Sequence, residues 1–145
     1  MYKKLALALS MNAVLMFLVT YAMIDRLDHM FFNINRVYMT LMMVAPMAVI
    51  MLSVMRSMYP NRQLNYLLIV AAIALFALSF ALARTQTPVG NVQFLRSMVP
   101  HHSSAIVMCE EANLTDSEII SLCEEIVQTQ EEEITQMRTI LERLR

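Results

Sequence analysis

Residues 64–83, with the sequence LNYLLIVAAIALFALSFALA, form an apolar run of 20 residues that contains no charged side chain. A helix of this length rises by about 30 Å, which matches the hydrocarbon thickness of a bilayer. Two further uncharged apolar runs, residues 5–24 and 37–55, have 20 and 19 residues. The sequence therefore predicts three membrane-spanning helices in a membrane domain that covers residues 1–83.

The composition of the whole chain restricts its fold class. Of the 145 residues, 58% are hydrophobic, 16% are charged, fifteen are methionine and one is glycine. A single glycine cannot supply a Walker loop or a dinucleotide fingerprint, and turn-rich β architectures need more of it. Abundant Leu, Met, Ala, Ile and Glu favour helix, so the predicted class is all-α.

The charges of the short connections predict the orientation of the spans. Lys3 and Lys4 precede the first span, and Arg56 and Arg62 lie between the second and third, with no acidic residue in either segment. By the positive-inside rule these segments are cytoplasmic. The first apolar run exceeds a signal-peptide core and no A-x-A-like cleavage site follows it, so it reads as a retained anchor. We therefore expect an integral membrane protein with a cytoplasmic N-terminus and residues 84–145 outside the cytoplasm.

The second span is rich in methionine. It contains Met39, Met42, Met43, Met47, Met51 and Met55. Thioethers bind cuprous copper, so one interpretation is an ion conduit. Steps of four residues drift by about 40° each around a helix, and methionine is an adaptable, apolar packing residue. This geometry favours packing or lipid contact, and the sequence leaves open whether the span passes ions.

The C-terminal part of the chain has a different charge balance. Residues 1–83 carry six basic and two acidic residues, whereas residues 84–145 carry five basic and ten acidic ones. Residues 84–91 collect turn formers and read as a linker. Two helical segments follow in a domain of residues 92–145, the second starting at a capping box in residues 115–118, TDSE. We therefore expect a helical hairpin, and nucleic acid is not an expected partner of so acidic a domain.

A lone hairpin of about 50 residues buries too little surface to be stable by itself. We therefore expect either self-association of the hairpin into a four-helix bundle or its docking against a partner, and a homo-oligomer is the favoured outcome.

Four polar side chains lie on the apolar faces of the two predicted helices. His101 and His102 interrupt the first face, and Gln130 and Glu133 interrupt the second. Burying a neutral polar group without a partner costs about 1–3 kcal/mol, and burying a charge costs more. These groups therefore either satisfy one another or surround a ligand. Adjacent histidines alone also fit ordinary interior or surface side chains, since they lack the ligand spacing of structural zinc motifs.

Two sulfur atoms and a proline surround the histidine pair. Met98 precedes His101 by about one helical turn, and Met108 follows it by two. A mixture of imidazoles and thioethers suits copper, particularly cuprous copper, and is poor for magnesium or calcium. Pro100 removes one helical hydrogen bond and clashes with the carbonyl of Arg96, so the helix either kinks before the histidines or restarts there.

Residues 91–142 resemble the domain-of-unknown-function 305 family. Its pattern, F-[ML]-x-x-M-[IV]-P-H-H-x-x-A-I-x-M followed by I-x-x-x-Q-x-x-E-I-x-x-M, matches FLRSMVPHHSSAIVM at residues 94–108 and IVQTQEEEITQM at residues 126–137. The resemblance implies a ferritin-like helical arrangement, a location outside the cytoplasm and, in some members, copper binding. The ligands that it implies are Met98, His101, His102, Met108 and Met137, with Gln130 and Glu133 behind them or as alternative ligands.

Cys109 and Cys123 depart from the family pattern, which commonly has alanine at both positions. Small residues there imply a close approach of the two helices, so the cysteines are placed to face one another. A disulfide is one interpretation in an oxidising exterior. The alternatives are two free cysteines that pack as small apolar side chains, or Cys109 as a thiolate ligand of copper beside His102.

The sequence thus favours a membrane-anchored metal-binding protein outside the cytoplasm, which sequesters or relays copper through a Met/His site. The alternative is a structural or assembly subunit of a membrane complex, whose hairpin mediates oligomerisation without metal. An enzyme is not expected, because the sequence has no H-E-x-x-H, no Glu-x-x-His pair and no nucleophile elbow.

Overall fold

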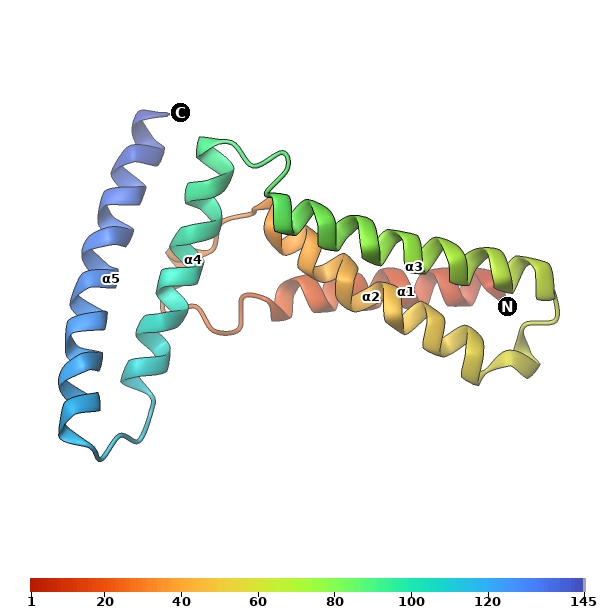
Figure 1. Cartoon of the computed structure of the whole chain (residues 1–145), viewed down its shortest axis with the longest axis horizontal. Coiled ribbons are helices and arrows are strands. Elements are labelled where there is room, and N and C mark those ends of the chain that lie inside the picture. Colours follow the sequence, from red (N-terminus) through yellow and green to blue (C-terminus); the bar gives the residue numbers. More distant parts are fainter. Residues whose placement is uncertain (145) are drawn as a thin grey trace. The chain divides into compact units, whose positions relative to one another are not determined.

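The computed structural model describes residues 1–144 as five α-helices and two short 3-10 turns, with no strand in that part of the chain (Figure 1). This confirms the predicted all-α class. The helices are α1 (Tyr2–Val19), α2 (Ile34–Val54), α3 (Arg62–Thr85), α4 (Asn91–Glu110) and α5 (Ser117–Arg143). The chain divides into two compact units, which we call the membrane unit and the hairpin unit.

The membrane unit consists of residues 1–20 and 35–88 and contains α1, α2 and α3. Each of these helices is long and apolar enough to cross a membrane. In their apolar windows only 6%, 22% and 11% of the residues are buried, so most side chains are available to lipid. Leu5, Leu52 and Tyr59 form the small buried core of this unit.

Polar contacts tie the helices of the membrane unit together near both ends. At one end the Tyr2 hydroxyl donates to Asn65 Oδ1 at 2.7 Å, and Asn65 Nδ2 donates to the Tyr59 carbonyl at 2.8 Å. At the other end the Tyr38 hydroxyl donates to the Thr87 carbonyl at 2.6 Å. Tyrosine suits these positions because one part of its ring is apolar and its hydroxyl is polar.

The helix ends differ from the predicted spans, most clearly in the first. The apolar run predicted a span over residues 5–24, but α1 ends at Val19. Tyr21 is buried in the hairpin unit, where its hydroxyl donates to the Phe31 carbonyl at 2.7 Å. The other two helices extend beyond the predicted ends at 37 and 64, and the predicted linker 84–91 shortens to residues 86–90.

Five of the six methionines in the predicted second span are divided between two environments. Met39, Met43 and Met47 are each more than 40% exposed, as expected of side chains that face lipid. Met51 and Met55 pack against the buried core of the membrane unit. The division supports packing and lipid contact rather than one continuous row of thioethers.

In the hairpin unit, α4 and α5 pack side by side and enclose a small apolar core (Figure 1). Its buried members are Leu95, Val99, Ile106, Ile134, Met137 and Leu141. Helix α5 begins one residue later than the expected capping box implies, because Asp116 is its N-cap. The Asp116 carboxylate accepts the backbone N–H groups of Glu118 and Ile119 at 2.9 and 3.1 Å.

Residues 21–34, which connect α1 to α2, also belong to the hairpin unit, and we call them the strap. The Asp25 backbone N–H donates to the Ser103 hydroxyl of α4 at 2.7 Å. Asp28 forms an ion pair with Arg138 of α5. This division differs from the predicted one, in which the hairpin began after residue 91 and the connection between the first two spans had no part in it.

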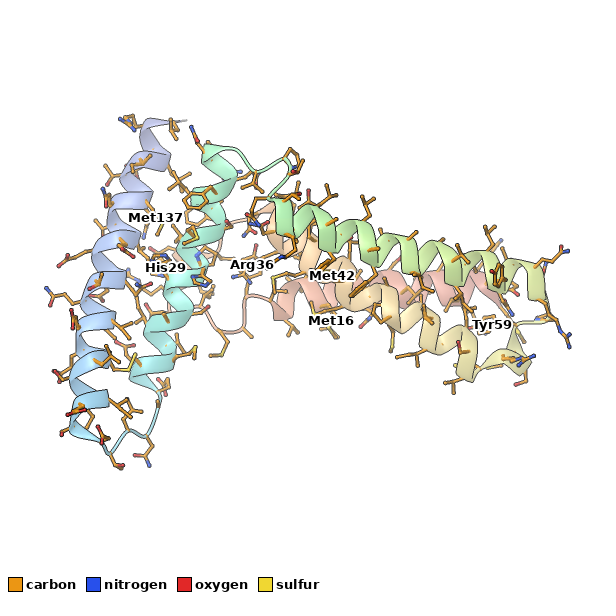
Figure 2. All side chains as sticks on the ribbon, in the orientation of Figure 1. Met16, His29, Arg36, Met42, Tyr59 and Met137 are labelled. Carbon is orange, nitrogen blue, oxygen red and sulfur yellow. A yellow bond between two sulfur atoms is a disulfide. The ribbon has the colours of Figure 1, made fainter. Side chains whose placement is uncertain are left out.

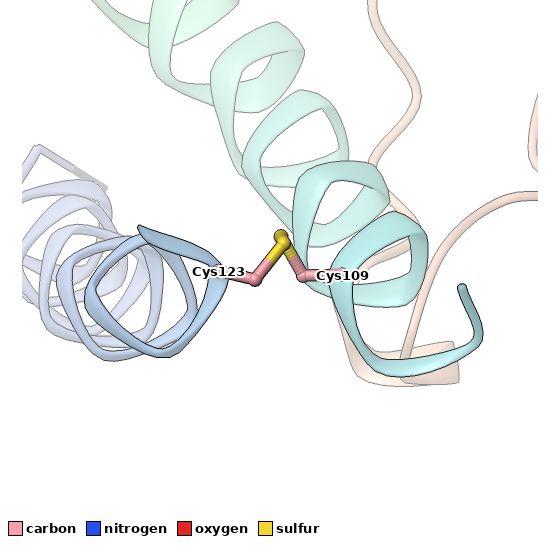
Figure 3. The surroundings of a disulfide bond; sticks show 2 residues. All are labelled: Cys109 and Cys123. Atoms are coloured by element: carbon pink, nitrogen blue, oxygen red, sulfur yellow. A yellow bond between two sulfur atoms is a disulfide. The ribbon is translucent and has the colours of Figure 1, made fainter. Parts of the chain in front are cut away.

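A disulfide joins Cys109 of α4 to Cys123 of α5, near the turn of the hairpin (Figure 3). The two Cα atoms lie 5.3 Å apart. Of the alternatives that the sequence left open, the structure thus contains the disulfide. In this state the Cys109 sulfur is not a thiolate and cannot serve as the ligand of copper that was one of the interpretations.

Replacing both cysteines by alanine should lower the free energy of unfolding of the hairpin unit. The bond closes a loop of about 15 residues, for which the chain-entropy model gives about 3 kcal/mol. Denaturant unfolding of the full chain in detergent, followed by circular dichroism, measures the difference. Reduced wild-type protein should behave like the double variant, and complete thiol labelling of the folded, unreduced wild type would contradict the disulfide.

Candidate functional site

Helix α4 carries both histidines and continues without interruption through Pro100. Of the two alternatives that the sequence left open at this proline, a kink or a restart of the helix, the restart does not occur. The ring of His101 is exposed, whereas only 13% of the His102 side chain is exposed. The two ring centroids are 5.8 Å apart, with the rings edge to face. One turn of α4 thus presents an open imidazole next to a largely buried one.

Three of the four polar groups that the sequence placed on facing helix surfaces meet in the structure, and the fourth, His101, is exposed. His102 Nδ1 lies 2.8 Å from the Glu133 carboxylate of α5. Gln130 Nε2 donates to the same carboxylate oxygen at 3.4 Å. The ring nitrogen and the carboxylate are close, but His102 Nδ1 has no well-aligned hydrogen bond within residues 1–144. Glu133 therefore orients the ring mainly by electrostatic attraction.

Burial keeps His102 neutral. Desolvation is the largest influence and lowers the pKa of His102 below 6.5, the nearby Glu133 carboxylate raises it, and His101 lowers it again. The net effect is a lowered pKa, so the imidazole is uncharged near neutral pH. A neutral imidazole has one nitrogen lone pair free to accept a proton or bind a metal.

The three methionines proposed as ligands occupy different environments. Met98 is partly buried and lies one turn before the histidines, on the same side of α4. Met108 is 63% exposed, whereas Met137, which is labelled in Figure 2, is 9% exposed and belongs to the apolar core. The structure therefore groups Met98 with His101 and His102, leaves Met108 open at the surface, and uses Met137 for packing.

A metal site at His101 and His102 would need the Met98 sulfur as a third ligand. Within residues 1–144, no three or more His, Cys, Asp or Glu side chains are grouped so that they could hold one metal ion. Two imidazoles with a thioether one turn away suit a soft cation such as cuprous copper and do not suit magnesium or calcium.

The sequence did not indicate the buried polar cluster between the strap and α4. His29, which is labelled in Figure 2, is 5% exposed, and Ser103 is fully buried. His29 Nδ1 lies 3.0 Å from the Ser103 hydroxyl. Burial is the main cause that lowers the pKa of His29. Only the tertiary contact reveals this pairing, because the two residues are 74 positions apart in a chain without a recognisable motif at His29.

Three apolar helices combined with a disulfide-linked hairpin and a histidine pair define a class of helical proteins with candidate membrane spans. Within it, the chain belongs to the family described as Domain of unknown function (DUF305), whose model matches residues 78–141. It is 32% identical over 112 residues to Uncharacterized protein L153 of Acanthamoeba polyphaga mimivirus, which covers 76% of this chain and 72% of that protein. An alignment of this length exceeds the hairpin, so the similarity extends into the membrane unit. No solved structure matches the chain.

Glu133→Gln should lower the pKa of His102 further, because the carboxylate is the main group that raises it. An NMR titration of the His102 ring in the full chain measures this pKa. Glu132→Gln is the matched control, since Glu132 is exposed and pairs with Gln128 on the outer side of α5. An unchanged or raised pKa in Glu133→Gln would show that the 2.8 Å approach has no electrostatic effect on the ring.

The hairpin unit should lose stability as the pH falls below about 6.5. The pKa of His29 is lowered in the folded protein, so the unfolded chain takes up its proton first and acid favours unfolding. The stability that neutral His29 contributes is fully present above the pKa of this residue in the unfolded chain. It is lost as the pH falls toward the lower pKa of His29 in the folded protein. In His29→Gln the dependence of the unfolding free energy on pH should be weaker between pH about 7 and 5. An identical dependence in wild type and variant would contradict this assignment.

Proposed function

We propose that this protein is a membrane-anchored metal-binding protein that sequesters or relays copper, with cuprous copper favoured, outside the cytoplasm. His101, His102 and Met98 would be its main ligands, and the exposed Met108 would be the residue that first meets an incoming ion. Met137 would support the site from the core. Glu133 and Gln130 would orient His102 from the other helix.

The observation that carries the proposal is the state of His102. Its ring is largely buried, uncharged near neutral pH, and held 2.8 Å from a carboxylate that a neighbouring glutamine also contacts. A carboxylate behind an imidazole is the usual way in which proteins orient a histidine ligand and increase its basicity. Together with the adjacent His101 and Met98, this arrangement supports binding of a soft cation.

The strap supports the proposed location of the hairpin. Because the strap and the hairpin form one compact unit, we expect both to lie on the same side of a membrane. The chain between them contains α2 and α3, and two crossings return it to the side from which it started. The basic residues Lys3, Lys4, Arg56 and Arg62 then favour the cytoplasm for the opposite side. Membrane lipid is the partner proposed for the membrane unit.

A titration of the full chain in detergent with cuprous copper, in competition with a chromogenic chelator, tests the proposal. The His101→Ala/His102→Ala double variant should lose the tightest site, with a decrease in affinity of at least about 100-fold, because each ligand is a first coordination contact. Affinity equal to that of the wild type in the double variant would contradict the assignment.

Glu132→Gln is the matched control for this titration. Glu132 is exposed on α5 and accepts a hydrogen bond from Gln128, so its replacement should leave the copper affinity unchanged. The control also separates the hairpin site from weak binding by the exposed methionines of α2, which all variants retain.

A second candidate function is a structural subunit that assembles through the hairpin without metal. The polar cluster of the candidate site favours it, because His102, Glu133 and Gln130 contact one another. These contacts can satisfy the buried polar groups without a metal ion. The exposed Phe94 and Met108 of α4 support self-association, which would complete a four-helix bundle. Assembly that persists after chelation and in the double histidine variant would favour this function over metal binding.

A further inference from the structure

Helix α4 contains a proline in its middle and nevertheless stays helical from Asn91 to Glu110. Proline has no N–H, so Pro100 cannot donate to the carbonyl of Arg96, four residues earlier. A carbonyl without a donor inside a packed unit weakens the fold, and helices tend to kink or open at such a position. A donor from outside the helix can replace the missing N–H at the Arg96 carbonyl.

That donor is Asn33 of the strap. Its side-chain nitrogen Nδ2 lies 3.3 Å from the Arg96 carbonyl oxygen and donates to it. The same nitrogen donates to the Phe31 carbonyl at 3.0 Å, so both of its hydrogens are used. Asn33 is fully buried, and Phe31 packs against the apolar core of the hairpin. The strap thus replaces the hydrogen bond that the proline removes.

A second strap contact holds α4 on the other side of the histidine pair. The buried Ser103 hydroxyl accepts the Asp25 backbone N–H at 2.7 Å and lies 3.0 Å from His29 Nδ1. The Asn33 contact lies before residues 100–102 and the Ser103 contact directly after them. The strap therefore fixes the helix on both sides of the segment that carries the two imidazoles.

We propose that the strap positions the metal site, with Asn33 as the positioning residue that sets the direction of His101 and His102. Asn33 bonds to the helix backbone and acts on the imidazoles through it. A kink at Pro100 would move His102 relative to Glu133, which it approaches to 2.8 Å. The expected effect of Asn33 on copper affinity rests on the proposed function. The expected effect of Asn33 on the orientation of the two imidazole rings does not.

Two distant parts of the sequence would then build the site together. Asn33 and Arg96 are 63 positions apart, and the strap precedes α2 while the histidines follow α3. The hairpin supplies the donor atoms, and the connection between the first two spans determines where those atoms point.

A double-mutant cycle in the full chain, in detergent, tests the proposal. Asn33→Ala removes the donor and should weaken cuprous copper binding about 10- to 100-fold, the range typical of residues that orient metal ligands. Pro100→Ala supplies a backbone N–H for the Arg96 carbonyl, so adding Asn33→Ala to it should change the affinity by less than about threefold. Equal losses in both backgrounds, or no loss in either, would overturn the proposal.

Asp28→Asn is the matched control on the strap. It removes the exposed ion pair with Arg138 but leaves the Asn33 contact, so the affinity should change by less than about twofold. If Asn33→Ala does not fold, the Asn33→Ala/Pro100→Ala variant decides. A double variant that folds and binds like Pro100→Ala supports the proposal, and one that also fails to fold contradicts it.

NMR signals of the His101 and His102 rings in metal-free protein separate this proposal from the proposed function. Asn33→Ala should shift these signals, and the additional Pro100→Ala change should return them toward the Pro100→Ala spectrum. If the wild type binds no copper, the metal function fails while the ring signals still decide the role of the strap. Ring signals that do not change in Asn33→Ala would overturn it.

Discussion

The hydrogen bond from Asn33 to the Arg96 carbonyl is the interaction on which the proposed position of the histidine pair depends. Pro100 takes a donor away from α4 immediately before the two histidines, and Asn33 restores one from a different part of the chain. The Arg96 carbonyl belongs to the backbone of α4, and the Asn33 side-chain amide is buried in the strap. The contact therefore forms only while the strap is packed against α4. We propose that this contact sets the position of the imidazoles and, with it, the 2.8 Å approach of His102 to Glu133.

Much of this architecture follows from local sequence patterns. Uncharged runs of about 20 residues predict helices of membrane length, and the apolar stripes of residues 92–145 predict a hairpin that buries one face of each helix. The matched positions of Cys109 and Cys123 on those helices made their disulfide one of the expected outcomes. These features depend on periodicity and length, which a sequence displays directly.

The strap could not be predicted in the same way. Tyr21 and Met23 continue the apolar run of the first span, so composition gives no sign that α1 ends at Val19. Asn33 reads as an ordinary loop residue until the missing donor of Pro100 is set against it in space. The sequence grouped the ligands of the proposed site by helical position, but it assigned Met137 and Met108 the same role although one is buried and the other exposed.

The central claim is that one turn of α4 binds copper through nitrogen and sulfur together. X-ray absorption at the copper edge, measured on the full chain loaded with one equivalent of cuprous copper, tests it most directly. The account predicts both imidazole nitrogen and thioether sulfur around the metal, with the imidazole contribution lost in His101→Ala/His102→Ala. Copper removed by dialysis, or bound by thioethers alone in the wild type, would contradict it.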